Sequence, residues 1–201
     1  MDMNHVPIEW INKIFQIIHD CNWHTFILLT KRPIRMKQYL DTVFGWPFPN
    51  VWVGCTVCNQ EEADAKIPIL LQIPAAVIWI SHEPALEKIT YPKEFLKRGN
   101  RAWLITGGET GPGARPMHPD IPRYDRNQCV SAGIPYFFKQ WGEWTAEPGW
   151  YLPDKFGSSY KSIIVDKDKL DKTGISMGRV GKKKAGRLLD GKEWDQYPEI
   201  L

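Results

Sequence analysis

Residues 103–119 read WLITGGETGPGARPMHP, an apolar run followed by four glycines within seven residues. A carboxylate, a guanidinium and an imidazole follow in the same stretch, at Glu109, Arg115 and His118. In α/β proteins, a buried strand that leads into a Gly-rich loop and then a helix brings functional groups to the carboxyl end of the sheet. We therefore expect the functional face of the protein at this loop.

The hydrophobic pattern on both sides of the loop predicts alternating helices and strands. Helices are expected over 6–21, from Pro33 to about 44, after Asn59 and over 119–132, with a single turn near 92–97. Strands are expected over 24–30, 51–57, 75–81, 101–106 and 136–140. Three tryptophans within these strands, Trp52, Trp79 and Trp103, are predicted to belong to the core.

This order predicts an α/β fold with a parallel sheet of about five strands, flanking helices and right-handed crossovers. Five strands cannot close an eight-stranded barrel, so we expect a partial, incomplete TIM-type (β/α) barrel over residues 1–145. An open sheet of five strands would be a complete fold, whereas a barrel arc would leave an exposed edge. Residues 146–201 are predicted to form an irregular basic extension, with a short hairpin near 160–166.

The four cysteines, the absence of a signal peptide and the absence of an apolar run of 18 residues favour a cytoplasmic protein with free thiols and no membrane span. Cys55 and Cys58 form a C-x-x-C motif on a predicted strand. Side chains three residues apart on a strand point to opposite faces, so we expect no metal site there.

The charge is concentrated in the last quarter of the chain. Residues 1–154 hold 15 Lys and Arg against 16 Asp and Glu, whereas residues 155–201 hold 11 against 7. A basic segment of this kind permits contact with nucleic acid, and a merely solvated tail is the alternative.

In a parallel sheet, the carboxyl ends of all strands meet at one face, and here they lead into polar residues. The candidate catalytic residues, chosen as proton acceptors or donors, are Glu83, Glu109 and His118. The candidate substrate- or anion-binding residues are Lys31, Arg32, Gly107, Gly108, Arg115, Lys139 and Gln140. The loop matches neither the P-loop nor the dinucleotide fingerprint. The alternative is that these charged residues only cap helix starts.

Several motifs resemble the phage gp-thirty-seven/gp-sixty-eight family, a phage and prophage group of unresolved function. They occur in the family's order over almost the whole chain: LTKRP (29–33), NVWVG (50–54), ISHEP (80–84), GGETGPGARPM (107–117), FFKQWGEW (137–144) and GKKKAGRLLDG (181–191).

That family resembles the radical S-adenosylmethionine barrels of the spore photoproduct lyase type, whose cluster cysteines lie on the first barrel strand. The resemblance implies that a full-length relative modifies nucleic acid or nucleotides with an iron–sulfur cluster and S-adenosylmethionine. This chain has no such cysteine motif, so it is expected to carry no cofactor of its own.

Two other functions stay open: a nucleic-acid-binding module without catalysis, and a hydrolase or transferase that uses the strand-end Glu, Arg and Lys residues. Whether the chain is an enzyme is not decided by the sequence. Nucleic acid or a nucleotide is the expected partner. A homodimer or a partner chain is expected to cover an open barrel edge.

Overall fold

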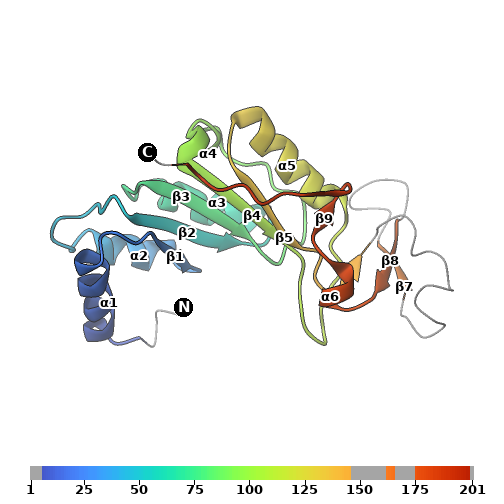
Figure 1. Ribbon diagram of the computed structural model, residues 1–201, viewed down its shortest axis with the longest axis horizontal. Helices are drawn as coiled ribbons and strands as arrows, with labels where there is room; N and C mark the ends of the chain where they lie inside the picture. Colours follow the sequence, from blue (N-terminus) through green and yellow to red (C-terminus); the bar gives the residue numbers. More distant parts are fainter. Residues whose placement is uncertain (1–5, 146–161, 166–174, 200–201) are drawn as a thin grey trace.

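The computed structural model describes residues 6–145, 162–165 and 175–199 (Figure 1). Its central feature is a five-stranded parallel sheet in the order β1-β2-β3-β4-β5. The strands are β1 (Phe26–Thr30), β2 (Val51–Val57), β3 (Val77–His82), β4 (Ala102–Gly107) and β5 (Tyr136–Gln140). The helices before and between them are α1 (Ile8–Asp20), α2 (Pro33–Leu40), α3 (Gln60–Leu70), α4 (Lys93–Leu96) and α5 (Asp120–Ala132).

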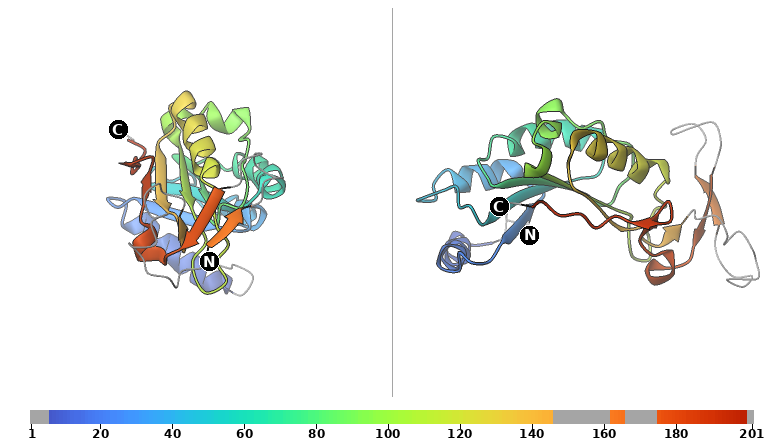
Figure 2. Two further views of the ribbon diagram at one scale, coloured as in Figure 1. Left: turned by 90° about the vertical axis from the view of Figure 1, so that its right-hand side faces the viewer. Right: turned by 45° about the horizontal axis from the view of Figure 1, so that its top comes forward.

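The strands follow one another in the sheet in the same order as in the chain. Right-handed crossovers between such strands place every connecting helix on the same face of the sheet. Figure 2 shows helices α2 to α5 on one side of a curved sheet, whose other side carries none of them. This is the arrangement of a barrel arc. The α/β class and the partial, unclosed barrel predicted from the sequence are therefore confirmed.

Alternation along the strands divides the core between the two faces of the sheet. On β2, Val51, Val53, Cys55 and Val57 belong to the large core beneath the helices. Trp52 points to the opposite face and packs with Trp79 and Trp103, whose ring centroids lie 5.8 Å apart. Gly54 makes room for this cluster, because a methyl group there would overlap the Trp79 indole. The prediction that these tryptophans are core residues is confirmed.

One edge of the sheet is covered by the end of the chain. Residues 194–196 run antiparallel to β5, where Phe138 N–H donates to Trp194 O over 2.8 Å and Gln196 N–H donates to Tyr136 O over 3.2 Å. The β1 edge has no strand partner among the described residues. Ile27 and Leu29 on that edge are 44% and 37% exposed. The expected homodimer or partner chain at an open edge stays a prediction.

The end of helix α2 differs from the predicted one, whereas α3 starts after Asn59 as predicted. Helix α2 ends at Leu40, and Phe44, which the pattern placed on its buried face, is fully exposed. After Leu40 the backbone continues in tighter turns, in which Thr42 N–H donates to Tyr39 O and Val43 N–H donates to Leu40 O. At α3, Asn59 Oδ1 caps the helix by accepting the Glu62 N–H over 2.8 Å, and the Glu62 carboxylate accepts the N–H of Cys58.

The end of the chain has more regular structure than the sequence indicates. Strands β6 (Trp144–Thr145), β8 (Ile175–Arg179) and β7 (Ser162–Val165) form an antiparallel sheet in that order. The predicted hairpin corresponds to β7, which pairs with β8, and the residues between them lie outside the described residues. A short helix, α6 (Lys182–Ala185), and a hairpin of β9 (Leu188–Leu189) and β10 (Lys192–Glu193) follow. The described parts of this extension therefore hold short regular elements that the hydrophobic pattern does not indicate.

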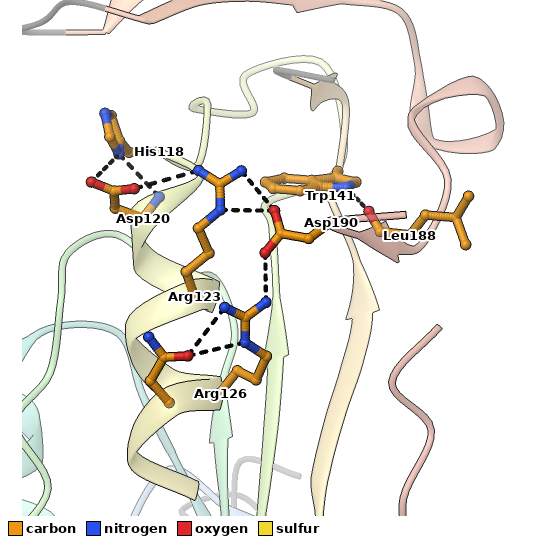
Figure 3. Close-up of polar contacts among 8 residues, drawn as sticks. His118, Asp120, Arg123, Arg126, Trp141, Leu188 and Asp190 are labelled. Atoms are coloured by element: carbon orange, nitrogen blue, oxygen red, sulfur yellow. Dashed lines mark hydrogen bonds and ion pairs between the residues drawn. The ribbon is translucent and has the colours of Figure 1, made fainter. Parts of the chain in front are cut away.

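The β9–β10 turn is fixed to helix α5 by charge. Asp190 accepts hydrogen bonds from Arg123 Nη2 over 2.7 Å and from Arg126 Nη1 over 2.5 Å (Figure 3). These hydrogen bonds hold the pKa of the Asp190 carboxyl below its usual value. The pairing explains the ordered end of the chain, because a basic tail gains a fixed position when its acidic turn meets two arginines.

No helix among the described residues has the length and apolar character to span a membrane.

Candidate functional site at the carboxyl ends of the strands

Glu83 lies at the centre of the polar face. It follows β3 directly, and its carboxylate accepts a hydrogen bond from Lys139 Nζ over 2.8 Å and one from Gln140 Nε2 over 3.3 Å. Both partners belong to β5, so the contacts span the intervening strand β4. The Glu83 and Lys139 side chains are 23% and 48% exposed. Three of the predicted site residues are thus brought together, with charges that a ligand can reach.

Gly107 at the end of β4 lets these contacts form. A Cβ atom at this position would lie 3.0 Å from Glu83 Oε1, closer than nearly all Cβ contacts in proteins. The missing side chain therefore leaves the space in which the Glu83 carboxylate lies between β3 and β5. Gly107 O also accepts the N–H of Ala85 over 2.9 Å, which fixes the chain after Glu83.

The Gly-rich loop is held against the end of β5 by close backbone contacts. A methyl group on Gly108 would overlap the carbonyl oxygen of Trp141, and one on Gly142 would overlap that of Glu109. The loop gains hydrogen bonds from this approach, since Gly108 N–H donates to Gln140 O and Glu143 N–H donates to Glu109 O. Gly108 is therefore a packing residue for the loop, and its predicted role as an anion-binding amide stays a prediction.

Glu109 and Arg115 form an ion pair within the Gly-rich loop. Arg115 Nε and Nη2 each donate to a different carboxylate oxygen of Glu109 over 2.8 Å, and the Arg115 backbone N–H adds a third bond over 2.8 Å. These hydrogen bonds lower the pKa of Glu109 to about 2. The Arg115 side chain is 59% exposed, so a guanidinium already oriented for two parallel hydrogen bonds faces solvent.

Lys31 and Cys58 follow β1 and β2 at the same face. Burial raises the pKa of the Cys58 thiol, while the nearby Lys31 ammonium opposes that rise. Cys58 O accepts the N–H of Leu86 over 3.2 Å, so the end of β2 lies against the chain that follows Glu83. Arg32 directly precedes α2. Together with Lys31 and Lys66, it lines a hollow of about 440 Å³ between α2 and α3.

His118 is buried at the start of α5, with 2% of its side chain exposed. Its Nδ1 accepts the backbone N–H of Asp120 over 3.2 Å, as a residue that caps a helix start does (Figure 3). This placement favours the capping alternative for His118, and its catalytic role stays a prediction.

The sequence pattern did not reveal a buried polar cluster directly beneath the face. His82 Nδ1 lies 2.7 Å from Asp125 Oδ2, which also accepts the Thr106 hydroxyl over 2.7 Å. Tyr91 donates its hydroxyl proton to Asp125 Oδ1 over 3.1 Å. His82, which directly precedes Glu83 at the end of β3, therefore points into the core. The signal that could have found the cluster is Asp125 itself, a carboxylate four residues from Ile121 and Cys129 on the buried stripe of α5.

The cysteines do not form a metal centre. Cys55 is fully buried, and burial raises the pKa of its thiol to about 12, whereas Cys58 is partly exposed at the end of β2. Cys129 is a buried residue of α5, and Cys21 follows α1. Across residues 6–145, 162–165 and 175–199, no three His, Cys, Asp or Glu side chains are grouped to hold a metal ion.

The fold and this face define a class: partial (β/α) barrels with a charged site at the carboxyl ends of their strands. Within that class, the chain belongs to the family described as "Protein of unknown function (DUF5131)", whose match covers residues 1–198. Comparison with curated proteins gave no significant match, and neither did comparison with solved structures. The resemblance to the phage gp-thirty-seven/gp-sixty-eight family stays a prediction.

Proposed function

We propose that the face at the carboxyl ends of the strands binds a phosphate-bearing substrate, a nucleotide or a nucleic acid, and that Glu83 exchanges a proton with it. The observation that carries the proposal is the bridge from Glu83 to Lys139 and Gln140 across β4. An ion pair this exposed contributes about 1 kcal/mol or less to stability. The contacts of Glu83 with Lys139 and Gln140 across Gly107 of β4 therefore add little to the stability of the fold, which favours a functional role for them.

Arg115 and Glu83 have different roles in this proposal. Arg115 presents a planar guanidinium that binds a phosphate through two parallel hydrogen bonds, in exchange for or beside its present contact with Glu109. Glu83 accepts a proton from a substrate hydroxyl or amine and can return it in a later step. The Lys139 ammonium, 2.8 Å from the carboxylate, fixes the orientation of this proton acceptor.

A catalytic role for an iron–sulfur cluster and S-adenosylmethionine is proposed only for a longer phage or prophage relative. The thiols described here do not fit a cluster, because Cys55 and Cys129 are enclosed in the core and Cys58 lies apart at a strand end. No step of the proposed chemistry passes through such a group. The hydrolase or transferase alternative uses the same Glu83, Lys139 and Arg115 and is therefore the chemistry that these residues support by themselves.

Calorimetric titration with the four nucleoside 5′-monophosphates tests the proposal. We expect binding by the unaltered protein, weakened tenfold or more by Arg115→Ala, since loss of a bidentate phosphate contact costs about 1.4 kcal/mol or more. Lys37→Met is the matched control. It breaks a Lys–Asp pair of 2.7 Å on the exposed surface of α2 and should leave the affinity unchanged. Absence of binding to all four nucleotides, or equal affinities of the Arg115 and Lys37 variants, would refute the proposal.

Glu83→Gln separates binding from proton transfer. The amide keeps the shape of the side chain and loses the proton acceptor, so nucleotide affinity should change little while any turnover of the bound substrate is lost. If the variant instead unfolds at a much lower temperature, Glu83 is a structural residue and its assigned role is wrong.

A further inference from the structure

The end of the chain carries a concentrated run of positive charge. The nine residues from Arg179 to Arg187 contain five cationic side chains and no acidic one. Three of these are the consecutive lysines of α6, Lys182, Lys183 and Lys184, and all three are exposed. We call residues 179–187 the basic segment. The first 154 residues are nearly neutral, so this run is a local feature and not part of a general positive charge.

The basic segment is fixed beside the candidate site. Val180 and Gly181 both donate their backbone N–H to Glu143 O over 3.0 Å, and Trp141 N–H donates to Gly186 O over 3.2 Å. Both Glu143 and Trp141 belong to the chain just after β5. Figure 1 shows α6 next to the loop that follows β4. The lysines therefore lie at the border of the face that holds Glu83 and Arg115.

The Gly-rich loop and the basic segment also contact each other directly. Arg179 Nη2 donates to Gly111 O over 2.9 Å, and Gly111 N–H donates to the Glu143 carboxylate over 3.2 Å. The guanidinium of Arg179 lies over the Trp144 ring, 6.0 Å from its centroid. Because the loop and the segment are held by the same few groups, they form one continuous surface.

Arg187 continues the positive charge toward the site. Its guanidinium lies 5.1 Å from the centroid of Phe137, which precedes Lys139 by two residues on the same side of β5. The Arg187 Nε and Nη2 atoms are buried and have no hydrogen-bond partner within the described part of the chain. The Glu193 carboxylate lies 3.7 Å from Nε, as an ion pair. The Arg187 side chain as a whole is 38% exposed, so its charge adds to the positive potential at the surface beside the site.

We propose that the basic segment binds the sugar–phosphate backbone of a nucleic-acid strand, so that the substrate of the strand-end site is a polymer and not a free nucleotide. This inference rests on the proposed function. A free nucleotide carries its phosphates in one place and needs only Arg115. A nucleic-acid strand carries one negatively charged phosphate per nucleotide. Its backbone can therefore contact Lys182, Lys183 and Arg187 while one nucleotide enters the site.

The test is fluorescence anisotropy with a labelled single-stranded 20-mer oligonucleotide in 50–200 mM NaCl. Lys182→Gln with Lys183→Gln should weaken binding at the lowest salt tenfold or more. It should also reduce the slope of log Kd against log salt by about 1.4, because each phosphate of a single strand that is no longer neutralised lowers the slope by about 0.7. The matched control is Lys93→Gln with Lys97→Gln, two exposed lysines of the α4 region whose replacement removes the same charge.

The outcomes separate this inference from the proposed function. Selective loss in the α6 variant, with unchanged nucleoside monophosphate affinity, supports it. Equal effects of the α6 and α4 variants, or no binding of the oligonucleotide while monophosphates still bind, overturn it and leave the proposed function in place. Displacement of the oligonucleotide by polyglutamate at equal charge concentration shows a surface for acidic protein, and that result also overturns the inference. If monophosphates do not bind, the proposed function fails first.

Discussion

His82 Nδ1 and Asp125 Oδ2 lie 2.7 Å apart, and neither side chain has any exposed surface. The pair joins the end of β3 to the middle of α5. His82 directly precedes Glu83 in the chain. Thr106 and Tyr91 supply further hydrogen bonds to the same carboxylate. The polar face above and the buried cluster below therefore share a strand end, and the position of Glu83 depends on how firmly that strand end is held.

Asp125→Ala should lower the free energy of unfolding by about 3–5 kcal/mol. Removal of one partner of a buried pair leaves the other donors without an acceptor, and that loss is larger than the value of the pair itself. Urea unfolding followed by circular dichroism measures the change. Asp64→Ala is the control, because Asp64 is exposed on α3 and accepts a hydrogen bond from Gln60, so its loss should cost less than about 0.5 kcal/mol. Equal losses in the two variants would contradict the assigned role of Asp125.

Two of the glycines of the loop, Gly108 and Gly113, should respond differently to the same substitution. Gly108→Ala should destabilise the protein by about 1–3 kcal/mol, because its methyl group meets the Trp141 carbonyl and the backbone must move. A Cβ at Gly113 meets nothing within 4 Å, so Gly113→Ala should be nearly neutral. Thermal unfolding of the two variants is the measurement. A neutral Gly108→Ala would show that the loop does not lie against the end of β5 as described.

The sequence predicts the five strands well because each is an almost continuous apolar run bounded by turn residues, the pattern of a buried parallel strand. Val51–Val57 has the bounds that were expected. Site residues at strand ends are predictable for the same reason, since topology brings Glu83 and Lys139 to one face. The pairing of Glu83 with β5 rather than with the loop depends on the space at Gly107, which no periodicity encodes.

The folded end of the chain is the part that sequence patterns miss. Its strands are short, two to five residues, and are held by contacts with distant residues such as Asp190 with Arg123. Neither side of such a contact carries a local signal. The same holds for Asp125, whose partners come from three other segments.

The Glu109–Arg115 pair predicts a specific pH dependence. The pKa of Glu109 is lowered to about 2 in the folded protein, below its ordinary value near 4.5. The pair therefore contributes stability above about pH 4.5, and this contribution is lost as the pH falls toward 2. Its size is at most about 1 kcal/mol, since both groups are partly exposed. The melting temperature of Glu109→Gln should lie slightly below that of the unaltered protein at pH 7, and the two should converge at low pH. A difference that stays constant down to pH 2.5 would contradict the prediction.

Asp190 should control access to the lysines of α6. Its carboxylate is held by Arg123 and Arg126, and its backbone takes a left-handed conformation (φ +53°) that alanine adopts only at a cost. Asp190→Ala therefore loses two ion pairs and gains strain, and trypsin should cleave at residues 182–184 at least fivefold faster, as expected for a loss of about 1 kcal/mol in local stability. Asp190→Asn tolerates the left-handed backbone and loses only the charge, so its cleavage rate should lie between the two. The exposed Asp195, altered to Asn, is the control and should leave the rate unchanged. If Asp190→Ala is cleaved as slowly as the unaltered protein, the β9–β10 turn is not held by these arginines, and the position of the basic segment rests on its backbone contacts with the chain after β5 alone.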